Sequence, residues 1–557
     1  MSKSRDIADS AATINFIDGL TSDAQTQINT KATLDGSPTF TGTVTATAFS
    51  GDGSGLTGVD SLPDQAGNAG SYLTTDGTDA SWASVGGASI EAVASGTIAN
   101  GDMIVVNSDG TVSTVFYNNT SQNIGSVSTF DNTTTLYIDS AFDSNSNKVV
   151  VVYQDDGLGA GSAGTAVVGT VSGTSISFGT PVVFQSGYTD RIVCTFDSNS
   201  NKVVVSYRNS SNGKAIVGTV SGTSISFGSA VTFLAANNLD NQITFDSNEN
   251  KVVLFYEDSS NSSQLTARVG TVSGTSISFG SSVVVDGNPE NIDATFDTTA
   301  NKVIVTFKDA SNSSYGTARV GTVSGTSISF GSATVFQSSN TLWTACAYDS
   351  NANKTLVAYQ HVNAGEGGFG RVGTVSGTSI SFGTNYEFDT QFADQISCAY
   401  DSYAKKVVIC FRGTDSGIGR IVSAKINNTA ITYDSVSTFE SGNTMYNATV
   451  FDSSQNKIVN SYRDVSDSSF GKSIVFTTGF IEQNLTVDNF IGISDGAYSD
   501  GSTATVQIIG GVDDAQSGLS PANKYYVQQD NTLSTTPDDP SVFAGTAISA
   551  TKIIIKG

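Results

Sequence analysis

One motif, Asp-Ser-Asn-x-Asn-Lys, recurs along the chain and places side-chain oxygens at alternate positions. Calcium loops require oxygen ligands spaced in this way. The motif lacks the Asp-Gly pair and the late bidentate carboxylate of known calcium loops, and a lysine closes every copy. We therefore expect Asx turns with a cross-strand pair between aspartate and lysine, and no metal site or other cofactor. The lysines are Lys148, Lys202, Lys251, Lys302, Lys354, Lys406 and Lys457.

Carboxylates in the predicted loops are the second group that could do chemistry. A glycosidase needs two of them at a fixed separation, with cations that position the substrate. No pair stands out by spacing, and the Ser-x-Asp-x-Gly-x-Thr-Trp box of sialidase propellers is replaced by Ser-Gly-Thr-Ser. Arg268, Arg319 and Arg371 recur at one position of a repeat, which indicates a structural role. We therefore expect no catalytic residue. The loop carboxylates are Asp155, Asp190, Glu257, Asp258, Asp293, Asp309, Glu366, Asp394 and Asp464.

The four cysteines show neither a Cys-x-x-Cys pair nor a histidine spacing, since the chain has a single histidine, His361. Cys194, Cys346 and Cys398 each stand three residues before a repeated aspartate, where the other copies mostly carry small residues. A small buried thiol fits such a position. We expect structural cysteines rather than a redox or metal site.

A repeated aspartate sets the period of the chain. It stands at 143, 197, 246, 297, 349, 401 and 452, with spacings of 54, 49, 51, 52, 52 and 51 residues. An aromatic residue precedes it, lysine follows five residues on, and tyrosine or phenylalanine follows ten residues on. A fixed period near fifty residues is typical of a repeat architecture.

Each copy predicts four strands joined by hairpin-length loops. In the second copy they are 192–196, 203–207, 215–220 and 225–233. Four antiparallel strands in each repeat are typical of a propeller blade, so we expect an all-β chain whose residues 124–479 form a seven-bladed β-propeller.

The two ends of the repeat region predict how the ring closes. The last copy departs from the pattern at Thr477 after three strands, whereas 124–130 resembles the fourth strand at 433–439. Pairing of 126–130 with 472–476 would remove two unpaired strand edges. We therefore expect the N-terminal strand to complete the last blade.

Loop variation predicts a binding face. The turns between strands one and two and between strands three and four are nearly identical in all copies, whereas the loops on the opposite rim differ in each. A rigid scaffold with variable loops on one side is typical of a binding surface. Exposed aromatic platforms beside hydrogen-bonding groups suit sugars and protein receptors, and Trp343 is the strongest candidate. The candidate binding residues are Trp343, His361, Tyr188, Asp190, Phe392, Tyr446 and Arg208.

Residues 1–62 differ in composition from the repeats. Residues 20–28 predict a short helix with an apolar stripe of Leu20, Ala24 and Ile28, too short to persist alone. The following Thr/Gly-rich stretch alternates with period two but has few apolar groups. One copy cannot build a core, so we expect this segment to wind together with other chains.

Several of these stretches resemble the N-terminal and shaft segments of bacteriophage tail fibres, notably from phages of marine cyanobacteria. They are Ser-Arg-Asp-Ile-Ala-Asp at 4–9, 18–29, Ser-Pro-Thr-Phe-Thr-Gly-Thr-Val at 37–44, 49–59 and 70–82. The resemblance covers about the first ninety and the last seventy residues. It implies a trimeric virion fibre attached through its N-terminus to other tail or baseplate proteins.

The strands outside the repeats predict a second domain split in sequence. We expect an attachment and shaft segment at 1–62, a linker with one hairpin at 63–90, the first half of a β-domain at 91–123 and its second half at 480–557. The propeller would be inserted between the halves, because a ring closed by its own N-terminal strand has adjacent ends.

The net charge of −25 and the scattered basic residues exclude a phosphate-binding footprint, so nucleic acid is not an expected partner. The chain has no run of apolar residues long enough to span a membrane and no apolar signal peptide, so we expect synthesis in the host cytoplasm and assembly into a virion. We expect a homotrimeric tail fibre whose propeller binds host surface glycan or an outer-membrane protein. A glycan-cleaving propeller hydrolase and a purely structural virion spacer or decoration protein are the alternatives.

Overall fold

The computed structural model describes residues 71–75, 80–84, 89–157, 161–362, 365–413 and 416–556. In these residues the fold is all-β, with a short 3-10 turn, η2 (Ser259–Asn261). None of the described helical segments is long and apolar enough to cross a membrane. The helix expected at 20–28 and the shaft segment 1–62 lie outside the described residues. The chain divides into two compact parts, and we describe each by itself.

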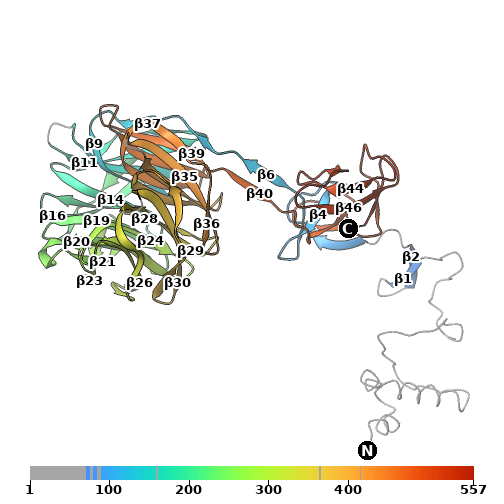
Figure 1. Cartoon of the computed structure of the whole chain (residues 1–557), viewed down its shortest axis with the longest axis horizontal. Coiled ribbons are helices and arrows are strands. Elements are labelled where there is room, and N and C mark those ends of the chain that lie inside the picture. The colour runs from blue at the N-terminus through green and yellow to red at the C-terminus, as the bar shows by residue number, and fades with distance from the viewer. Residues whose placement is uncertain are drawn as a thin grey trace, which may run out of the picture. The chain divides into compact units, whose positions relative to one another are not determined.

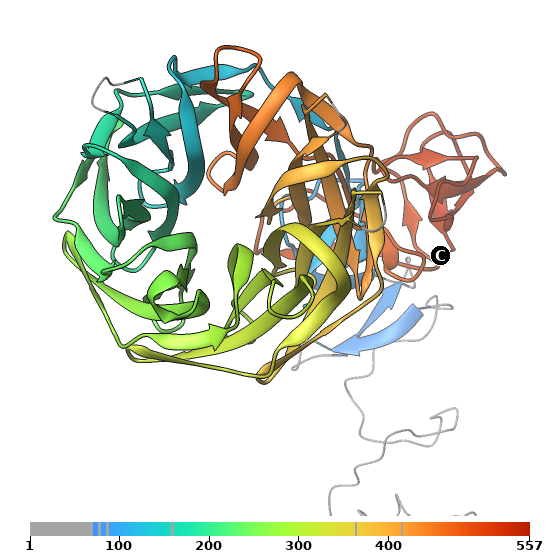
Figure 2. The ribbon, with the colours of Figure 1, turned by 60° about the vertical axis from the view of Figure 1, so that its left-hand side comes forward.

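The larger part, Val115–Thr486 with Gln529–Thr532, is a ring of small antiparallel sheets (Figures 1 and 2). In repeats 1 to 6 the first four strands pair in chain order and the last strand pairs with the third. Repeats 4 and 5 are joined through a shared strand, as are repeats 6 and 7. Repeat 1 contains β9 (Thr135–Asp143), β10 (Lys148–Asp155), β11 (Ala163–Ser172), β12 (Ser175–Phe178) and β13 (Val182–Gln185). Repeat 2 contains β14 (Thr189–Asp197), β15 (Lys202–Asn209), β16 (Asn212–Ser221), β17 (Ser224–Phe227) and β18 (Val231–Leu234). Repeat 3 contains β19 (Asn238–Asp246), β20 (Lys251–Asp258), β21 (Gln264–Ser273), β22 (Ser276–Phe279) and β23 (Val283–Asp286).

The later repeats follow the same plan, but β28 and β37 each run from one repeat into the next. Repeat 4 contains β24 (Pro289–Asp297), β25 (Lys302–Asp309), β26 (Tyr315–Ser324), β27 (Ser327–Phe330) and the start of β28 (Thr334–Asp349). Repeat 5 contains the rest of β28, β29 (Lys354–His361), β30 (Gly367–Ser376), β31 (Ser379–Phe382) and β32 (Tyr386–Asp389). Repeat 6 contains β33 (Ala393–Asp401), β34 (Lys406–Gly413), β35 (Ile418–Asn427), β36 (Ala430–Tyr433) and the start of β37 (Ser437–Asp452). Repeat 7 contains the rest of β37, β38 (Lys457–Asp464) and β39 (Phe470–Thr477).

The fourth strand of a repeat differs from the expectation. It was expected as one strand but consists of two segments, such as β17 and β18, which both pair with the third strand β16. A glycine between the segments explains the interruption, because its backbone lies against the next repeat. A Cβ on Gly228 would lie 1.9 Å from the carbonyl oxygen of Thr275.

The first strands of the repeats line the inside of the ring. They contact one another in the order β9, β14, β19, β24, β28, β33, β37 and back to β9. The ring therefore closes on itself, as Figure 2 shows.

The closing strand confirms the expected pairing. β7 (Asn123–Ile124) and β8 (Ser128–Asp131) both pair with β39, with Thr129 opposite Lys472 and Ile124 opposite Phe476. The contact with the next repeat is close, since a Cβ on Gly125 would lie 1.8 Å from the carbonyl oxygen of Thr174. The chain enters and leaves the ring through β6 (Tyr117–Thr120) and β40 (Phe480–Gln483), which pair with each other.

The second strands form the centre of each sheet, because both of their faces are covered. Val149 to Tyr153 in β10 are fully buried, as are Val203 to Val205 in β15. Such runs of β-branched residues suit strands that are buried on both faces. The apolar clusters lie between neighbouring repeats, and one of them joins Val459 and Val475 of repeat 7 to Val151 of repeat 1.

The repeated aspartates form the expected Asx turns. In repeat 2, Asp197 Oδ1 accepts the N–H groups of Asn199 at 3.0 Å and Ser200 at 2.9 Å. Asn201 has a φ of 55°, the left-handed region that asparagine tolerates. Aspartate and lysine lie opposite each other across the strand pair in all seven repeats, as expected, for example Asp197 and Lys202. None of the seven aspartates forms an ion pair with a described lysine. The aspartates are buried on turn amides, whereas the lysines opposite are half-buried, and Lys406 pairs with Asp434 instead.

The smaller part contains residues from both sides of the ring in sequence. One sheet has the order β3-β42-β41-β4-β5, and a second has the order β43-β47-β46-β44-β45. The first contains β3 (Ser89–Val93), β4 (Met103–Val106), β5 (Val112–Thr114), β41 (Phe490–Ser494) and β42 (Thr503–Gln507). The second contains β43 (Val512–Asp513), β44 (Lys524–Val527), β45 (Leu533–Ser534), β46 (Val542–Ala547) and β47 (Ile553–Ile555). The expected hairpin is also present, with β1 (Ser71–Thr75) paired to β2 (Ala80–Ser84).

Candidate binding site on the variable rim

A bulge interrupts every first strand at the same place. The register between the first and second strands shifts in all seven repeats, for example between Asp190 and Val193. We call the residue six positions before the repeated aspartate the bulge position. It carries Tyr137, Arg191, Asp240, Asn291, Trp343, Gln395 and Tyr446. It lies near the start of the strand, beside the loops that differ between repeats, which we call the variable rim.

The backbone at the bulge position is strained. Six of these residues have positive φ values between 47° and 55°: Tyr137, Arg191, Asn291, Trp343, Gln395 and Tyr446. A non-glycine residue in this region costs about 1 kcal/mol or more. Bulges re-aim side chains and are frequent near binding sites. The fold therefore presents six kinds of side chain from seven repeats at one level of the ring.

Three bulge residues from neighbouring repeats contact one another. The rings of Tyr137 in repeat 1 and Tyr446 in repeat 7 have centroids 5.3 Å apart. The Arg191 guanidinium of repeat 2 lies 5.5 Å from the centroid of Tyr137. Arg191 Nε is buried without a hydrogen-bond partner. Burial raises the pKa of Tyr446, and the nearby Tyr137 adds to the shift.

A second contact set lies beside these residues in repeat 2. Tyr188 donates a hydrogen bond to Asp190 Oδ2 at 2.9 Å, and Arg208 Nε donates to Asp190 Oδ1 at 2.7 Å. The arginine also binds Asp190 through its terminal nitrogen, which makes a bidentate pair. Burial and the Asp190 bond raise the pKa of Tyr188. Asp190 and Arg191 are consecutive residues of β14, which places this contact set next to the first one. We call these six residues the rim cluster: Tyr137, Tyr188, Asp190, Arg191, Arg208 and Tyr446.

Four of the candidate binding residues thus lie together, namely Tyr188, Asp190, Arg208 and Tyr446, and the other three lie elsewhere. The backbone N–H of Trp343 donates to Asn291 Oδ1 at 3.0 Å, and its half-buried ring packs against an apolar core cluster. His361 Nε2 lies 2.8 Å from Gln337 Nε2 beside Phe369. Burial and Arg371 lower the pKa of His361, so the imidazole is neutral at neutral pH. Phe392 lies under Arg412, which binds Asp394.

The polar bulge residues tie neighbouring repeats together. Asp240 Oδ2 accepts the N–H of Ile292 at 3.1 Å, Asn291 Oδ1 accepts that of Trp343, and Gln395 Oε1 accepts that of Tyr446 at 2.8 Å. Each bond runs from one repeat to the next. These side chains are therefore occupied by the scaffold. Of the rim cluster, Tyr188 is exposed, whereas Tyr137 and Tyr446 are half-buried and pack partly against apolar core clusters.

Several carboxylates that the sequence placed in loops lie in strands. Asp190, Asp293 and Asp394 belong to the first strands β14, β24 and β33, because the bulge moves the strand start toward the rim. Asp155, Asp258, Asp309 and Asp464 end second strands, where each accepts the N–H two residues on. These oxygens stabilise turns. In the described part of the chain, no group of three or more His, Cys, Asp or Glu side chains is placed to hold a metal ion.

Two aspartates inside the ring have unusual titration. Asp139 accepts the N–H groups of Ser140 at 2.8 Å and Cys194 at 2.7 Å, and Asp293 accepts that of Cys346 at 2.6 Å. Burial raises the pKa of Asp139 to about 7 and that of Asp293 to about 6. By accessible surface Asp139 is only half-buried, but the inner strands surround it and displace bulk water. Both occupy the position four residues before the repeated aspartate.

The four cysteines are free thiols in the structure. Cys194, Cys346 and Cys410 are buried, and Cys398 is half-buried. Burial raises the pKa of each thiol. This places the thiols in their unreactive protonated form.

Tyr137 and Arg191 were missed in the sequence. Their position carries six residue types in seven repeats, so it does not stand out in an alignment of the copies. One feature of the sequence could have indicated this position. Several repeats carry a charged or amide residue inside the first strand, six residues before the repeated aspartate.

No family model matches the chain, and no curated protein matches it. Among solved structures it is similar to AofleA from Arthrobotrys oligospora, at 9% identity over 60% of this chain and 92% of that one, with a TM-score of 0.37. The NanB sialidase of Streptococcus pneumoniae matches at 10% identity over 64% and 70%, with a TM-score of 0.39. The Aleuria aurantia lectin, in complex with alpha-methyl-L-fucoside, matches at 14% identity over 56% and 98%, with a TM-score of 0.36. At these scores, the ligands of those proteins indicate nothing about this chain.

Proposed function

We propose that this protein is a phage tail fibre whose ring is a seven-bladed β-propeller that binds a host surface glycan through its variable rim. The observation that supports this proposal is the rim cluster. One strand position, held in a strained bulge in repeat after repeat, carries different side chains around the ring. A strained backbone conformation that is kept while the side chain changes is typical of a surface that binds a ligand.

The chemistry of the rim cluster favours a sugar. Tyr137 and Tyr446 provide half-buried aromatic rings for the apolar side of a pyranose ring. The exposed Tyr188, whose proton goes to Asp190, provides a hydroxyl oxygen that can accept a hydrogen bond from a sugar. The one carboxylate of the rim cluster, Asp190, is poorly placed for glycoside hydrolysis. Asp190 is held by Arg208 and Tyr188, and a glycosidase needs two carboxylates facing one substrate position.

The test compares the full-length protein with a variant carrying Tyr137→Asn and Arg191→Asn. Asparagine is the residue of repeat 4 at the bulge position, so the left-handed backbone is retained. We expect adsorption to host cells to fall about thirtyfold, the effect of losing about 2 kcal/mol of contact energy. Trp343 is left intact because it belongs to repeat 5 and is not part of the rim cluster.

The control variant carries Tyr117→Ala and Lys202→Ala, which remove an exposed tyrosine and a lysine away from the variable rim. It should adsorb like the wild type, and all proteins should melt within a few degrees of one another. Adsorption by the rim variant at the wild-type level would refute the proposal. Release of sugar from host envelopes by the wild type would favour the hydrolase, and absence of any adsorption would favour the spacer.

A further inference from the structure

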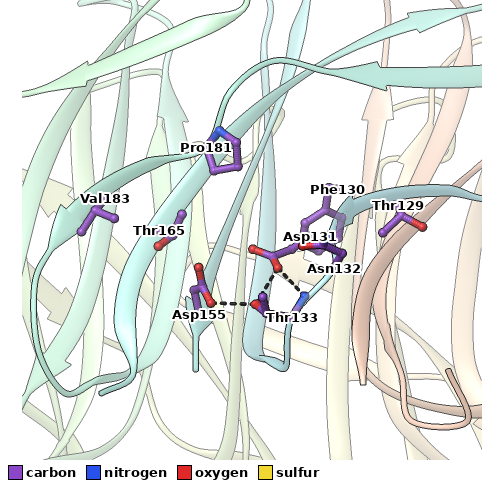
Figure 3. A pocket seen from close by; sticks show the side chains of 9 residues that line it. All are labelled: Thr129, Phe130, Asp131, Asn132, Thr133, Asp155, Thr165, Pro181 and Val183. Carbon is purple, nitrogen blue, oxygen red and sulfur yellow. Dashed lines mark hydrogen bonds between the residues drawn. The ribbon is translucent and has the colours of Figure 1, made fainter. Parts of the chain in front are cut away.

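A groove lies where the closing strand of repeat 7 meets repeat 1. It has a volume of about 600 Å³. Asp131, Asn132 and Thr133 form one side, and Asp155 and Thr165 form the other, as Figure 3 shows. The groove lies on the variable rim but does not include any residue of the rim cluster.

The third strand of repeat 1 differs from those of all other repeats. Two positions of this strand matter here. The first lies opposite the aromatic residue that follows the repeated aspartate by ten residues, and the second lies two residues further along the strand. In repeat 1 the aromatic residue is Tyr153. In repeats 2 to 7, one of these positions carries lysine or arginine. The cations are Lys214, Arg268, Arg319, Arg371, Arg420 and Lys472. Repeat 1 carries Thr165 and Val167 instead.

In two repeats the cation pairs with a carboxylate of the preceding sheet. Arg319 Nε donates to Asp286 Oδ2 at 2.8 Å, and Arg420 binds Asp389. Asp389 lies opposite Gly368 at the end of its fourth strand, and Asp131 lies opposite Gly471 in the same way. Asp131 is therefore the counterpart of Asp389, and Thr165 is the counterpart of Arg420. The groove therefore contains the aspartate of the pair, Asp131, but has threonine where repeat 6 has the arginine.

The two carboxylates of the groove accept backbone N–H groups but have no cation beside them. Thr133 N–H donates to Asp131 Oδ1 at 2.7 Å, and Gly157 N–H donates to Asp155 Oδ1 at 2.9 Å. Thr133 Oγ1 lies 2.6 Å from Asp131 Oδ1 and 2.7 Å from Asp155 Oδ1, but its single proton can serve only one of them at a time. Asp131 forms no ion pair with any described residue. Thr165 is fully buried, and its Oγ1 has no hydrogen-bond partner. Burial and the charge of Asp131 also raise the pKa of Tyr153 beneath the groove.

We propose that this groove binds a guanidinium or alkylammonium group of another molecule, at the place that Arg420 fills in repeat 6. The carboxylates of Asp131 and Asp155 provide the opposite charge, and charge-assisted bonds to a guanidinium are among the strongest available to a carboxylate. The group can come from a basic side chain of a protein or from an amino sugar. This site is independent of the glycan proposal for the rim cluster.

The test is calorimetric titration of the full-length protein with methylguanidinium, and with acetamide as the neutral control. We expect saturable binding of methylguanidinium that weakens as salt is raised, and none of acetamide. Asp131→Asn should weaken binding about tenfold or more, as expected for loss of one charge-assisted bond. The matched control, Asp286→Asn, removes an acid whose groove is already filled by Arg319 and should leave binding unchanged.

A second variant restores the missing cation. Thr165→Arg copies Arg420 and should abolish methylguanidinium binding while raising the melting temperature. Titration of the wild type with an arginine-containing peptide and with glucosamine then identifies the source of the cation. Tighter binding of the peptide indicates a protein, and tighter binding of glucosamine indicates a glycan. Absence of methylguanidinium binding to the wild type, or equal binding to Asp131→Asn, would overturn the proposal. Neither result would affect the adsorption test of the rim cluster.

Discussion

The protonation of a single carboxylate inside the ring, that of Asp139, makes the stability of the protein depend on pH. Asp139 receives two backbone N–H groups, but burial still raises its pKa to about 7. An unfolded aspartate titrates near pH 4. The folded protein therefore binds more protons than the unfolded chain between about pH 4 and pH 7, and its stability falls as pH rises through this window.

We expect Asp139→Asn to reduce this pH dependence. Asparagine carries no charge, so the variant does not incur the cost of an ionised group above pH 7. The difference in melting temperature between variant and wild type should therefore shift in favour of the variant from pH 5 to pH 8. Thermal melts at the two pH values measure this shift. A difference that is the same at both would mean that Asp139 titrates normally.

At the residue scale, the sequence predicted residues whose type repeats. The Asx turns were predicted because the aspartate, the left-handed asparagine and the lysine recur in sequence. The cross-strand pairing of aspartate and lysine was predicted for the same reason, but no ion pair joins them, because the buried aspartate accepts hydrogen bonds from nearby amides instead. Tyr137 and Arg191 could not be predicted, since a bulge fixes a backbone conformation without fixing a residue type.

Strands were predictable where apolar runs and turn motifs alternate with a fixed period. The second strands are examples, because their β-branched runs are buried on both faces. The split of each fourth strand was not predictable, since it follows from the approach of Gly228 and its counterparts to a neighbouring sheet. The closing strand was predicted because 124–130 resembles the fourth strand at 433–439, and its pairing with β39 is confirmed.

Gly125 gives a test of this element. A Cβ at this position would lie 1.8 Å from the carbonyl oxygen of Thr174, so Gly125→Ala must displace the closing strand from repeat 1. Overpacking of this kind costs about 2 kcal/mol. We expect a clear fall in melting temperature measured by calorimetry.

The control for this change is Ser126→Ala, which alters an exposed neighbour on the same strand. It should melt within a degree or so of the wild type. Equal melting of the two variants would indicate that the closing strand does not pack against repeat 1 in solution.

For the whole molecule, the remaining expectation concerns assembly. Residues 1–62 contain too few apolar groups to bury a core in one chain, so we expect the full-length protein to be a homotrimer. Light scattering at micromolar concentration measures the mass. A chain that begins just before Ser89 keeps β3 intact and should lose most of the association.

A monomeric full-length protein would contradict this expectation. It would also remove the support that the resemblance to tail fibres gives to the proposed function. Equal association of the full and shortened chains would instead place the interface outside the first 62 residues.

The paired entry and exit strands have a mechanical consequence. β6 and β40 connect to the two strands that close the ring, and Asn123 of β7 lies opposite Thr477 of β39. If the ring binds a cell as proposed, tension between that cell and the rest of the chain would pull both closing strands from the same end and in the same direction. Equal forces on two paired strands produce no sliding between them. A load on the adhered ring would be shared by two covalent connections, and the hydrogen bonds that keep the ring closed would not be peeled apart.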